Sequence, residues 1–380
     1  MNTFLHILSF IGSLGLFLYG MKIMSEGLEK LAGDHMRNIL GAMTRNRFMG
    51  VLTGVGVTAL IQSSSATTVM VVSFVNAGLM TLRQAIGVIM GANIGTTVTA
   101  WIISLIGFKV SISALSLPLL AIALPLFFAG KGKTKNWGEF LFGFAFLFMG
   151  LNLLSKAAES LEIGTHMAAW LSHLPCDRFW TIPLFVLMGT VMTMLMQSSS
   201  ASMAVTLMLF GMDIPGFGFA QAVALTLGEN IGTTITAFLA SLTANIQAKR
   251  AALAHLFFNV FGVIVVLAFF YPTIHAVEWL VTDVMGAESN NLYLVSAFHT
   301  CFNLMNTLLQ IGFVPQIERF VCWVLPVKTD QDEKSRLRYL SGGLLSTSEL
   351  NLMQAKKEIS LFAERCHRMF EFVNTLLTTE

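Results

Sequence analysis

The chain has 380 residues, of which 55% are hydrophobic and 12% are charged, whereas about 25% of residues are charged in an ordinary soluble domain. Residues 328–380 hold 8 of the 23 basic and 8 of the 21 acidic side chains, which leaves 28 charges in the first 327 residues. So few charges cannot solvate a water-facing surface of that size, and we expect lipid to cover much of it. The net charge of +2 excludes a nucleic-acid protein that depends on phosphate attraction.

Apolar stretches long enough to cross a bilayer, about 20 residues each, predict transmembrane helices. The first lacks the positive n-region and cleavage site of a secretory signal peptide, so we interpret it as an uncleaved transmembrane helix. Residues 47–107 and 178–244 are also apolar, but Gly, Ser, Thr, Asn and Gln interrupt them repeatedly, which is typical of broken or re-entrant helices. The uninterrupted stretches are residues 4–24, 110–129, 137–154, 251–271 and 292–313.

Two polar motifs each occur twice, in the same order. One recurs after 135 residues and the other after 137, and packing alone does not require the same ordered polar run twice. The first is Gln62, Ser63, Ser64 and Ser65, which returns as Gln197, Ser198, Ser199 and Ser200; the second is Asn93, Ile94, Gly95, Thr96 and Thr97, which returns as Asn230, Ile231, Gly232, Thr233 and Thr234.

These repeats predict an all-α, polytopic membrane protein with two transmembrane repeats. If each repeat crosses the membrane an odd number of times, the two are inverted, and transporters of that design bind substrate at the repeat interface near the middle of the membrane. We expect residues 1–130 to form the first repeat, 131–271 the second, 272–327 an additional helix with its connection, and 328–380 a cytoplasmic tail.

The basic residues predict the orientation of the chain. Residues 22–47 contain five Lys or Arg residues and residues 131–135 contain three Lys, whereas residues 271–290 contain three acidic residues and no Lys or Arg. By the positive-inside rule the first two segments and the tail are cytoplasmic. We therefore expect an outside N-terminus, an inside C-terminus and several membrane crossings.

Each Gln-Ser-Ser-Ser motif lies beside an apolar run, at residues 69–74 and 203–210. Serine is a favoured helix N-cap, so the motif predicts the point where a broken helix restarts with free N–H groups, and such a helix end attracts anions. Carbonyl, hydroxyl and carboxamide oxygens at the break are hard ligands that suit a small cation such as sodium. The alternative for any single Ser or Thr is helix packing.

The Asn-Ile-Gly-Thr-Thr motifs add a carboxamide, two hydroxyls and a glycine that lets backbone approach closely. None of the four motifs contains Lys or Arg. Neutral donors suit an anion that is released in every cycle, because charged bidentate contacts hold phosphate more tightly. The motifs therefore favour reversible binding, as in transport.

Glu229 stands where the first repeat has Ala92. An ionisable group inside an apolar segment is costly and is a candidate functional residue. Glu229 would either add negative charge to a cation site or carry a proton, and the alternative is a salt bridge or solvation in a cavity. His255 and Asn259 form a further pattern, His-x-x-Phe-Asn, that returns at His299 and Asn303. We interpret these histidines as packing residues that bond to broken-helix backbone.

Enzymatic motifs are missing from the sequence. It has no HExxH, no GxSxG, no Walker-type loop and no close pair of acids in its apolar part. The four cysteines have no CxxC spacing and predict neither a zinc site nor a disulfide framework. We expect a protein that is not an enzyme and that needs no cofactor.

Together, the doubled motifs and the His-x-x-Phe-Asn elements resemble the type-II sodium-phosphate cotransporter family in its bacterial branch, over residues 4–327. The resemblance implies a secondary transporter in the bacterial cytoplasmic membrane with sodium as coupling ion. It further implies that phosphate and sodium are bound by Gln62, Ser63, Ser64, Ser65, Asn93, Thr96 and Thr97 and by Gln197, Ser198, Ser199, Ser200, Asn230, Thr233 and Thr234.

Bacterial members often carry a PhoU-like helical domain after the membrane core. Residues 346–377 have apolar side chains at near-helical spacing and look like the first helix of such a domain. A single helix cannot bury such a face, so we expect the chain to be truncated.

Three functions remain open from sequence: sodium-coupled phosphate uptake, phosphate export, and a phosphate sensor that signals through the tail. A receptor needs one binding site but no second repeat, which favours transport. Other oxyanions and the oligomeric state stay open.

Overall fold

The computed structural model describes residues 2–42, 46–107, 112–174, 178–287, 291–326 and 348–378. These residues form helices and connecting turns, without any strand among them. The longer helices are α1 (Asn2–Ala42), α2 (Arg47–Ile61), α3 (Ser64–Asn76), α4 (Leu82–Ile102), α5 (Ile112–Phe128), α6 (Lys133–Ser160), α7 (Ile163–Leu171), α8 (Ile182–Met196), α9 (Ser199–Gly211), α10 (Phe219–Gly232), α11 (Thr234–Ser241), α12 (Ile246–Ala268), α13 (Phe270–Trp279), α14 (Asn291–Ile311), α15 (Val314–Val324) and α16 (Ser348–Thr378).

Six helices in the described part of the chain are long and apolar enough to cross a membrane. Two of them cover the predicted spans at residues 4–24 and 137–154, and a third, Ile246–Ala268, covers the predicted span at 251–271 except for its last three residues. Helix α14 covers residues 292–311 of the predicted span at 292–313, but a buried polar face keeps it outside the six. The predicted span at 110–129 lies partly outside the described residues. The six are Phe4–Leu31, Leu82–Leu105, Lys133–Ser160, Phe179–Met196, Phe219–Ser241 and Ile246–Ala268.

Helices α2, α3 and α4, here called the first half, contain the first copies of both motifs. Helix α2 lies against α4 at glycines: a Cβ on Gly54 would lie 2.1 Å from the carbonyl oxygen of Val88, and a Cβ on Gly91 would lie 2.0 Å from that of Val51. No side chain fits between backbones at such distances. Small residues therefore set how closely these helices approach, as they do in membrane helix pairs.

Helices α8 to α11, here called the second half, repeat this packing. A Cβ on Gly189 would lie 2.1 Å from the carbonyl oxygen of Leu225, and a Cβ on Gly228 would lie 2.0 Å from that of Val186. These residues are the sequence equivalents of the four in the first half. The duplication thus includes the contact between the helices as well as the polar motifs.

The second polar motif does not break its helix in the first half, contrary to the expectation of interruptions throughout residues 47–107. Helix α4 continues through Asn93 to Thr97. The hydroxyl of Thr96 donates to the carbonyl of Ala92 and that of Thr97 to the carbonyl of Ile94, so the helix itself satisfies these polar groups. In the second half, Thr233 separates α10 from α11.

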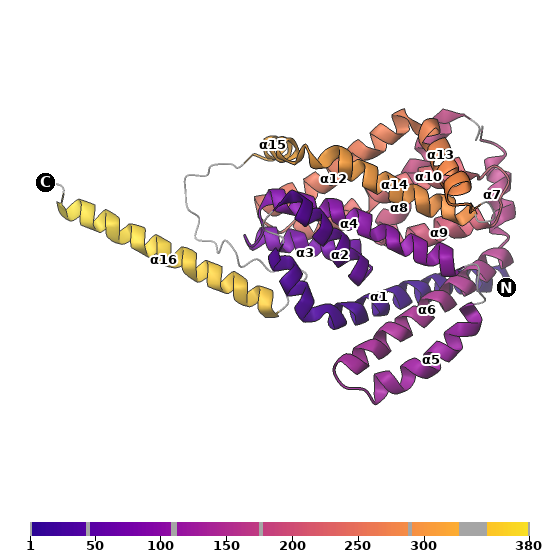
Figure 1. Ribbon diagram of the computed structural model, residues 1–380, viewed down its shortest axis with the longest axis horizontal. Coiled ribbons are helices and arrows are strands. Elements are labelled where there is room, and N and C mark those ends of the chain that lie inside the picture. Colours follow the sequence, from indigo (N-terminus) through magenta and orange to yellow (C-terminus); the bar gives the residue numbers. More distant parts are fainter. Residues whose placement is uncertain are drawn as a thin grey trace.

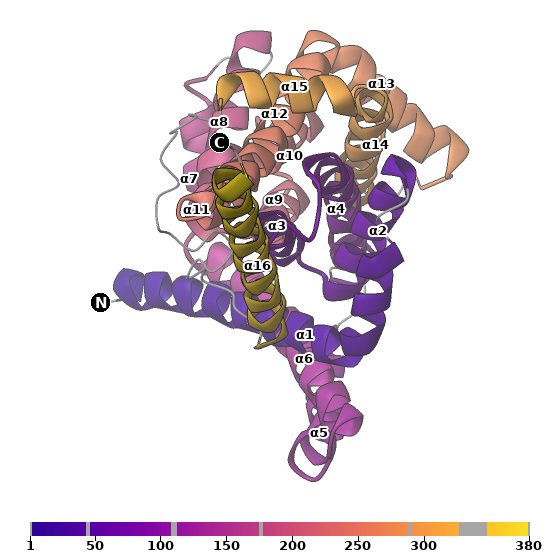
Figure 2. The ribbon, with the colours of Figure 1, turned by 90° about the vertical axis from the view of Figure 1, so that its left-hand side faces the viewer.

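Helix α1 runs along α6, and α5 pairs with α6 to form a hairpin that projects from the rest of the molecule (Figures 1 and 2). Glycines again permit the approach, since a Cβ on Gly20 would lie 2.3 Å from the backbone nitrogen of Leu147. This group of helices flanks the two halves. The polar motifs lie outside it.

Helix α15 covers the end of the membrane core, and three arginines tie it and its flanks to earlier parts of the chain. Arg250, 6% exposed, donates from Nε and Nη2 to the carbonyl of Leu325 over 3.0 and 2.8 Å. Arg47 donates to the carbonyl of Gly312 over 3.3 Å, and Arg83 pairs with Glu318. Helix α16 extends away from the core (Figure 1).

Candidate functional site

Both Gln-Ser-Ser-Ser motifs lie at a helix break with the same backbone geometry. Gln62 ends α2 in the left-handed conformation, with φ 58° and ψ 27°, and Gln197 ends α8 with φ 51° and ψ 24°. Ser63 and Ser198 are then extended and cap α3 and α9, since each hydroxyl accepts a hydrogen bond from the N–H three residues later. The predicted restart of a helix at each motif is therefore confirmed.

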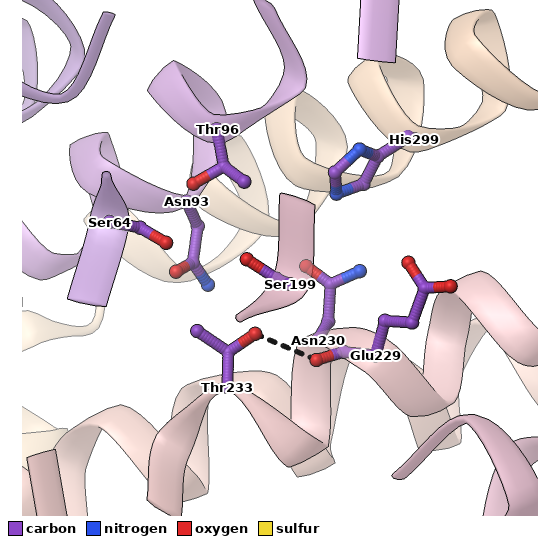
Figure 3. A pocket seen from close by; sticks show the side chains of 8 residues that line it. All are labelled: Ser64, Asn93, Thr96, Ser199, Glu229, Asn230, Thr233 and His299. Atoms are coloured by element: carbon purple, nitrogen blue, oxygen red, sulfur yellow. Dashed lines mark hydrogen bonds between the residues drawn. The ribbon is translucent and has the colours of Figure 1, made fainter. Parts of the chain in front are cut away.

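The first helical residues after these caps, Ser64 and Ser199, face a common pocket. Free N–H groups at both helix starts belong to the first turn. The pocket contains about 210 Å³ of space free of protein atoms, part of it open to solvent, and five described helices plus the α10–α11 junction contribute to its wall. In Figure 3, Ser64, Asn93 and Thr96 of the first half lie opposite Thr233 and Asn230 of the second half. The lining residues are Ser64, Asn93, Thr96, Ser199, Glu229, Asn230, Thr233 and His299.

Seven of the fifteen residues predicted from sequence line this pocket, and the other eight do not. Several of the eight have structural bonds instead. Thr97 donates to a carbonyl in its own helix and Thr234 to the carbonyl of Ile231 at the end of α10, and the hydroxyls of Ser63 and Ser198 are used as caps. The eight are Gln62, Ser63, Ser65, Thr97, Gln197, Ser198, Ser200 and Thr234.

Asn93 is held in place by α12. Its Nδ2 donates to Oδ1 of Asn259 over 2.7 Å, and its Oδ1 lies 3.4 Å from Nε2 of His255. A carboxamide oxygen only accepts hydrogen bonds, so this contact requires the proton on Nε2. The two contacts fix which end of the Asn93 carboxamide is the donor, and they show that His255 bonds to a motif side chain rather than to backbone.

Glu229 is the acid in the pocket wall. It is 1% exposed, and its Oε1 accepts a hydrogen bond from the hydroxyl of Thr206 over 2.6 Å. Its Oε2 is buried and has no hydrogen-bond partner in the structure. A buried polar atom without a partner is costly, so this oxygen is available to a ligand or a proton.

His299 is the pocket residue that sequence reasoning did not assign to the site. It is 4% exposed and comes from α14. The signal was the repeated His-x-x-Phe-Asn pattern, which we interpreted as packing. Its position beside Asn230 and Glu229 depends on how α14 packs against α10, which the pattern alone does not encode.

The pocket wall has many hydroxyls and carboxamides and no Lys or Arg among the residues that line it. Within the described residues, no group of three or more His, Cys, Asp or Glu could hold a metal ion. Hydroxyl, carboxamide and N–H groups can donate to an oxyanion, and the oxygens can coordinate a hard monovalent cation. The arrangement is suited to reversible binding of small ions.

Comparison with known proteins shows to which family the chain is related. The sequence profile of the family described as Na+/Pi-cotransporter matches residues 16–156 and 163–281. No solved structure matches the chain.

Two bacterial relatives match most of the chain. The "Putative inorganic phosphate export protein YjbB" of Escherichia coli K12 is 29% identical over 383 residues, which cover 100% of this chain and 66% of the relative. The chain thus spans slightly less than two thirds of that relative. "Uncharacterized protein YqeW" of Bacillus subtilis is 30% identical over 322 residues, covering 85% of this chain and 99% of the relative.

A human relative matches a shorter segment. "Sodium-dependent phosphate transport protein 2B" of Homo sapiens is 41% identical over 99 residues, which are 25% of this chain and 14% of the relative. The profile covers more than half of the chain. The chain belongs to the Na+/Pi-cotransporter family.

Proposed function

We propose that this protein is a secondary transporter that moves inorganic phosphate across the bacterial cytoplasmic membrane, coupled to sodium. The observation that carries the proposal is the pair of equivalent helix breaks whose restarting helices, α3 and α9, both face one pocket. A receptor or an enzyme needs no such duplicated site. Family membership and the six apolar helices support a transporter in a membrane.

Phosphate is proposed to bind between the starts of α3 and α9. The free N–H groups and the hydroxyls of Ser64 and Ser199 would donate to its oxygens, and the carboxamides of Asn93 and Asn230 would complete the contacts. Among the other motif residues, Ser63 and Ser198 would act by capping the two helices. Gln62, Ser65, Thr97, Gln197, Ser200 and Thr234 would act by shaping the breaks or by binding sodium.

Sodium is proposed to bind to oxygens at the same breaks. Glu229 would contribute because its unpartnered Oε2 supplies negative charge beside Asn230. A cation here would compensate for a buried carboxylate and would attract the phosphate anion into the same pocket. Coupling then follows from electrostatics, since each ion raises the affinity of the site for the other.

The two repeats are proposed to have inverted topology and to be re-entrant at the breaks, with residues 1–130 as the first repeat and 131–271 as the second. Residues 272–327 would add α14 and α15, and the tail at 328–380 would be cytoplasmic and PhoU-like in α16. The matched glycine contacts and matched caps of the two halves support this division. Alternating access would then expose the pocket to each side in turn.

Export is the second candidate function. The name of the Escherichia coli relative assigns it to inorganic phosphate export. The same site would serve either direction, because a coupled transporter runs down the sum of its gradients. The charge pattern in the sequence, which predicts an inside C-terminus, fits both.

Purified protein in liposomes tests the proposal. Labelled phosphate should accumulate when a sodium gradient is imposed and should not accumulate when potassium replaces sodium. Reversing the sodium gradient should reverse the net flux, which measures coupling independently of the physiological direction. Phosphate flux that does not depend on sodium would refute the proposed coupling. Flux of sulfate but not of phosphate would refute the proposed substrate.

A further inference from the structure

Equivalent hydroxyls on the two broken helices differ in their hydrogen bonds. In the first half, Thr58 on α2 donates to the hydroxyl of Thr67 on α3 over 3.0 Å. The equivalents in the second half are Thr193 and Ser202. The hydroxyl of Thr193 is buried without a partner. That of Ser202 donates to the carbonyl of Ser198, as that of Thr67 does to Ser63, and lies 3.7 Å from the sulfur of Met196. The link across the break is thus made in one half and unmade in the other.

The glutamine at each break follows the same pattern. Thr99 on α4 donates to Oε1 of Gln62 over 3.0 Å. Its equivalent, Thr236 on α11, donates to the carbonyl of Thr233 in the neighbouring turn. Gln62 is half-buried, whereas Gln197 is exposed. The glutamine side chain thus accepts a hydrogen bond from the neighbouring helix only in the first half.

The asparagines of the second motif differ as well. Asn93 donates to Asn259 on α12, whereas Asn230 donates to the carbonyl of Thr226 in its own helix over 2.8 Å. The second copy of Asn259 is Asn303 on α14. Its Nδ2 bonds to the carbonyl of His299, as that of Asn259 does to His255, but its Oδ1 is buried without a partner.

Helices α12 and α14 each contact both halves, and each brings the histidine of one His-x-x-Phe-Asn pattern to a different half of the site. Helix α12 packs against α3 and α4 of the first half and against α10 and α11 of the second, whereas α14 packs against α9 and α10 and also against α4. His255 of α12 contacts Asn93, while His299 of α14 lines the pocket next to Asn230. The repeated His-x-x-Phe-Asn pattern thus places one histidine beside the second-motif asparagine of each half.

We propose that the two halves form these hydrogen bonds alternately. When the three bonds exist in the first half, their equivalents in the second half are broken, and when those of the second half form, the bonds of the first half break. His299 and Asn303 are then the positioning residues for Asn230, as His255 and Asn259 are for Asn93. Buried oxygens without partners favour an arrangement that supplies partners, and the equivalent residues of the other half show what those partners are. The structure has the first half linked and the second half released.

This inference rests on the proposed function, because alternate linking is useful only to a protein that exposes one pocket to two sides. It goes beyond that function by naming residues outside the ion site, Thr58, Thr67, Thr193, Ser202, Asn259 and Asn303, that set which side is open.

Matched near-isosteric substitutions test it in the full chain. Thr58→Val removes a link that this structure contains, and Thr193→Val removes the same hydroxyl from the half where it is unpaired. Asn259→Leu and Asn303→Leu form the second pair. A single cysteine at Ser199, in a background with the four native cysteines replaced by alanine, reports pocket access through its labelling by a membrane-impermeant thiol reagent from each side of vesicles.

Thr58→Val and Asn259→Leu should shift the ratio of the two labelling rates in one direction by about fivefold, the weight of one net hydrogen bond. Thr193→Val and Asn303→Leu should shift it in the opposite direction. Shifts in the same direction, or unchanged ratios, would overturn the proposal, and two substitutions in each half keep the test decisive if one of them does not fold.

Labelling needs no phosphate, so the two proposals fail separately. Opposite shifts without phosphate flux by the unsubstituted protein would refute the substrate and leave alternate linking in place. Sodium-driven phosphate flux with unshifted labelling would refute alternate linking alone.

Discussion

Gly228 lies so close to Val186 that a Cβ on this glycine would sit 2.0 Å from the Val186 carbonyl oxygen. The contact fixes the distance between α8, which ends at the second break, and α10, which carries Glu229 and Asn230. A small separation of these backbones would move the two sides of the pocket apart. The glycine thus supports the site without touching it.

Gly228→Ala should lower the stability of the protein by roughly 1–3 kcal/mol, because the methyl group meets backbone that cannot move aside. Gly56 on α2 provides the control, since a Cβ there would meet no atom within 4 Å. Gly56→Ala should leave stability unchanged or raise it by up to about 1 kcal/mol, from helix propensity. Thermal unfolding of the purified variants in detergent measures both, and equal midpoints would contradict the close packing of α8 on α10.

Ser64→Ala combined with Ser199→Ala should abolish phosphate flux, because the two hydroxyls at the starts of α3 and α9 face the pocket together. Ser160→Ala, at the end of α6 away from the pocket, is the control and should transport normally. Flux into liposomes under a sodium gradient is the measurement. Normal flux in the double variant would refute the assignment of the site to the paired motifs.

Glu229→Gln should flatten the dependence of flux on sodium concentration and on pH, since it removes the negative charge while keeping an acceptor for Thr206. Glu278, whose side chain is 41% exposed on α13, gives the matched control Glu278→Gln. Initial rates over a series of sodium concentrations and pH values compare the two. Identical dependence on both in wild type and Glu229→Gln would show that this carboxylate only fills space.

Ser63→Ala should cost about 1 kcal/mol of stability and weaken phosphate binding, because it removes the acceptor that caps α3. Ser63→Gly should cost only a few tenths of a kcal/mol, since glycine tolerates the cap position. Unfolding midpoints and the phosphate concentration for half-maximal flux measure the two effects. If both variants unfold at the wild-type midpoint, the hydroxyl has no capping role.

Local rules allowed several features to be predicted from the sequence. The caps at Ser63 and Ser198 follow from residues next to one another along the chain, and the structure confirms them. The all-helical fold follows from the length and composition of the apolar stretches. The sequence repeat also predicted that both copies of each motif contribute to one site. One pocket is lined by residues from all four motif copies.

Features that depend on helix rotation could not be predicted in the same way. Ser64 faces the pocket and Ser65 does not, because successive residues in a helix are turned by about 100° and the sequence does not set the starting angle. The unbroken course of α4 through Asn93 depends on threonine hydroxyls that bond back to their own helix. His299 reaches the pocket only because α14 packs on α10.

The arginine contacts at the end of the core bear on the order of synthesis. Arg47 and Arg83 precede their partners near α15 by 265 and 235 residues, and Arg250 precedes Leu325 by 75. During synthesis none of the three arginines can form these contacts until the last part of the core has emerged from the ribosome. Until then the buried Arg250 lacks its acceptor at Leu325. The polypeptide therefore completes its membrane-embedded structure late, when α15 arrives to join segments that entered the bilayer long before it.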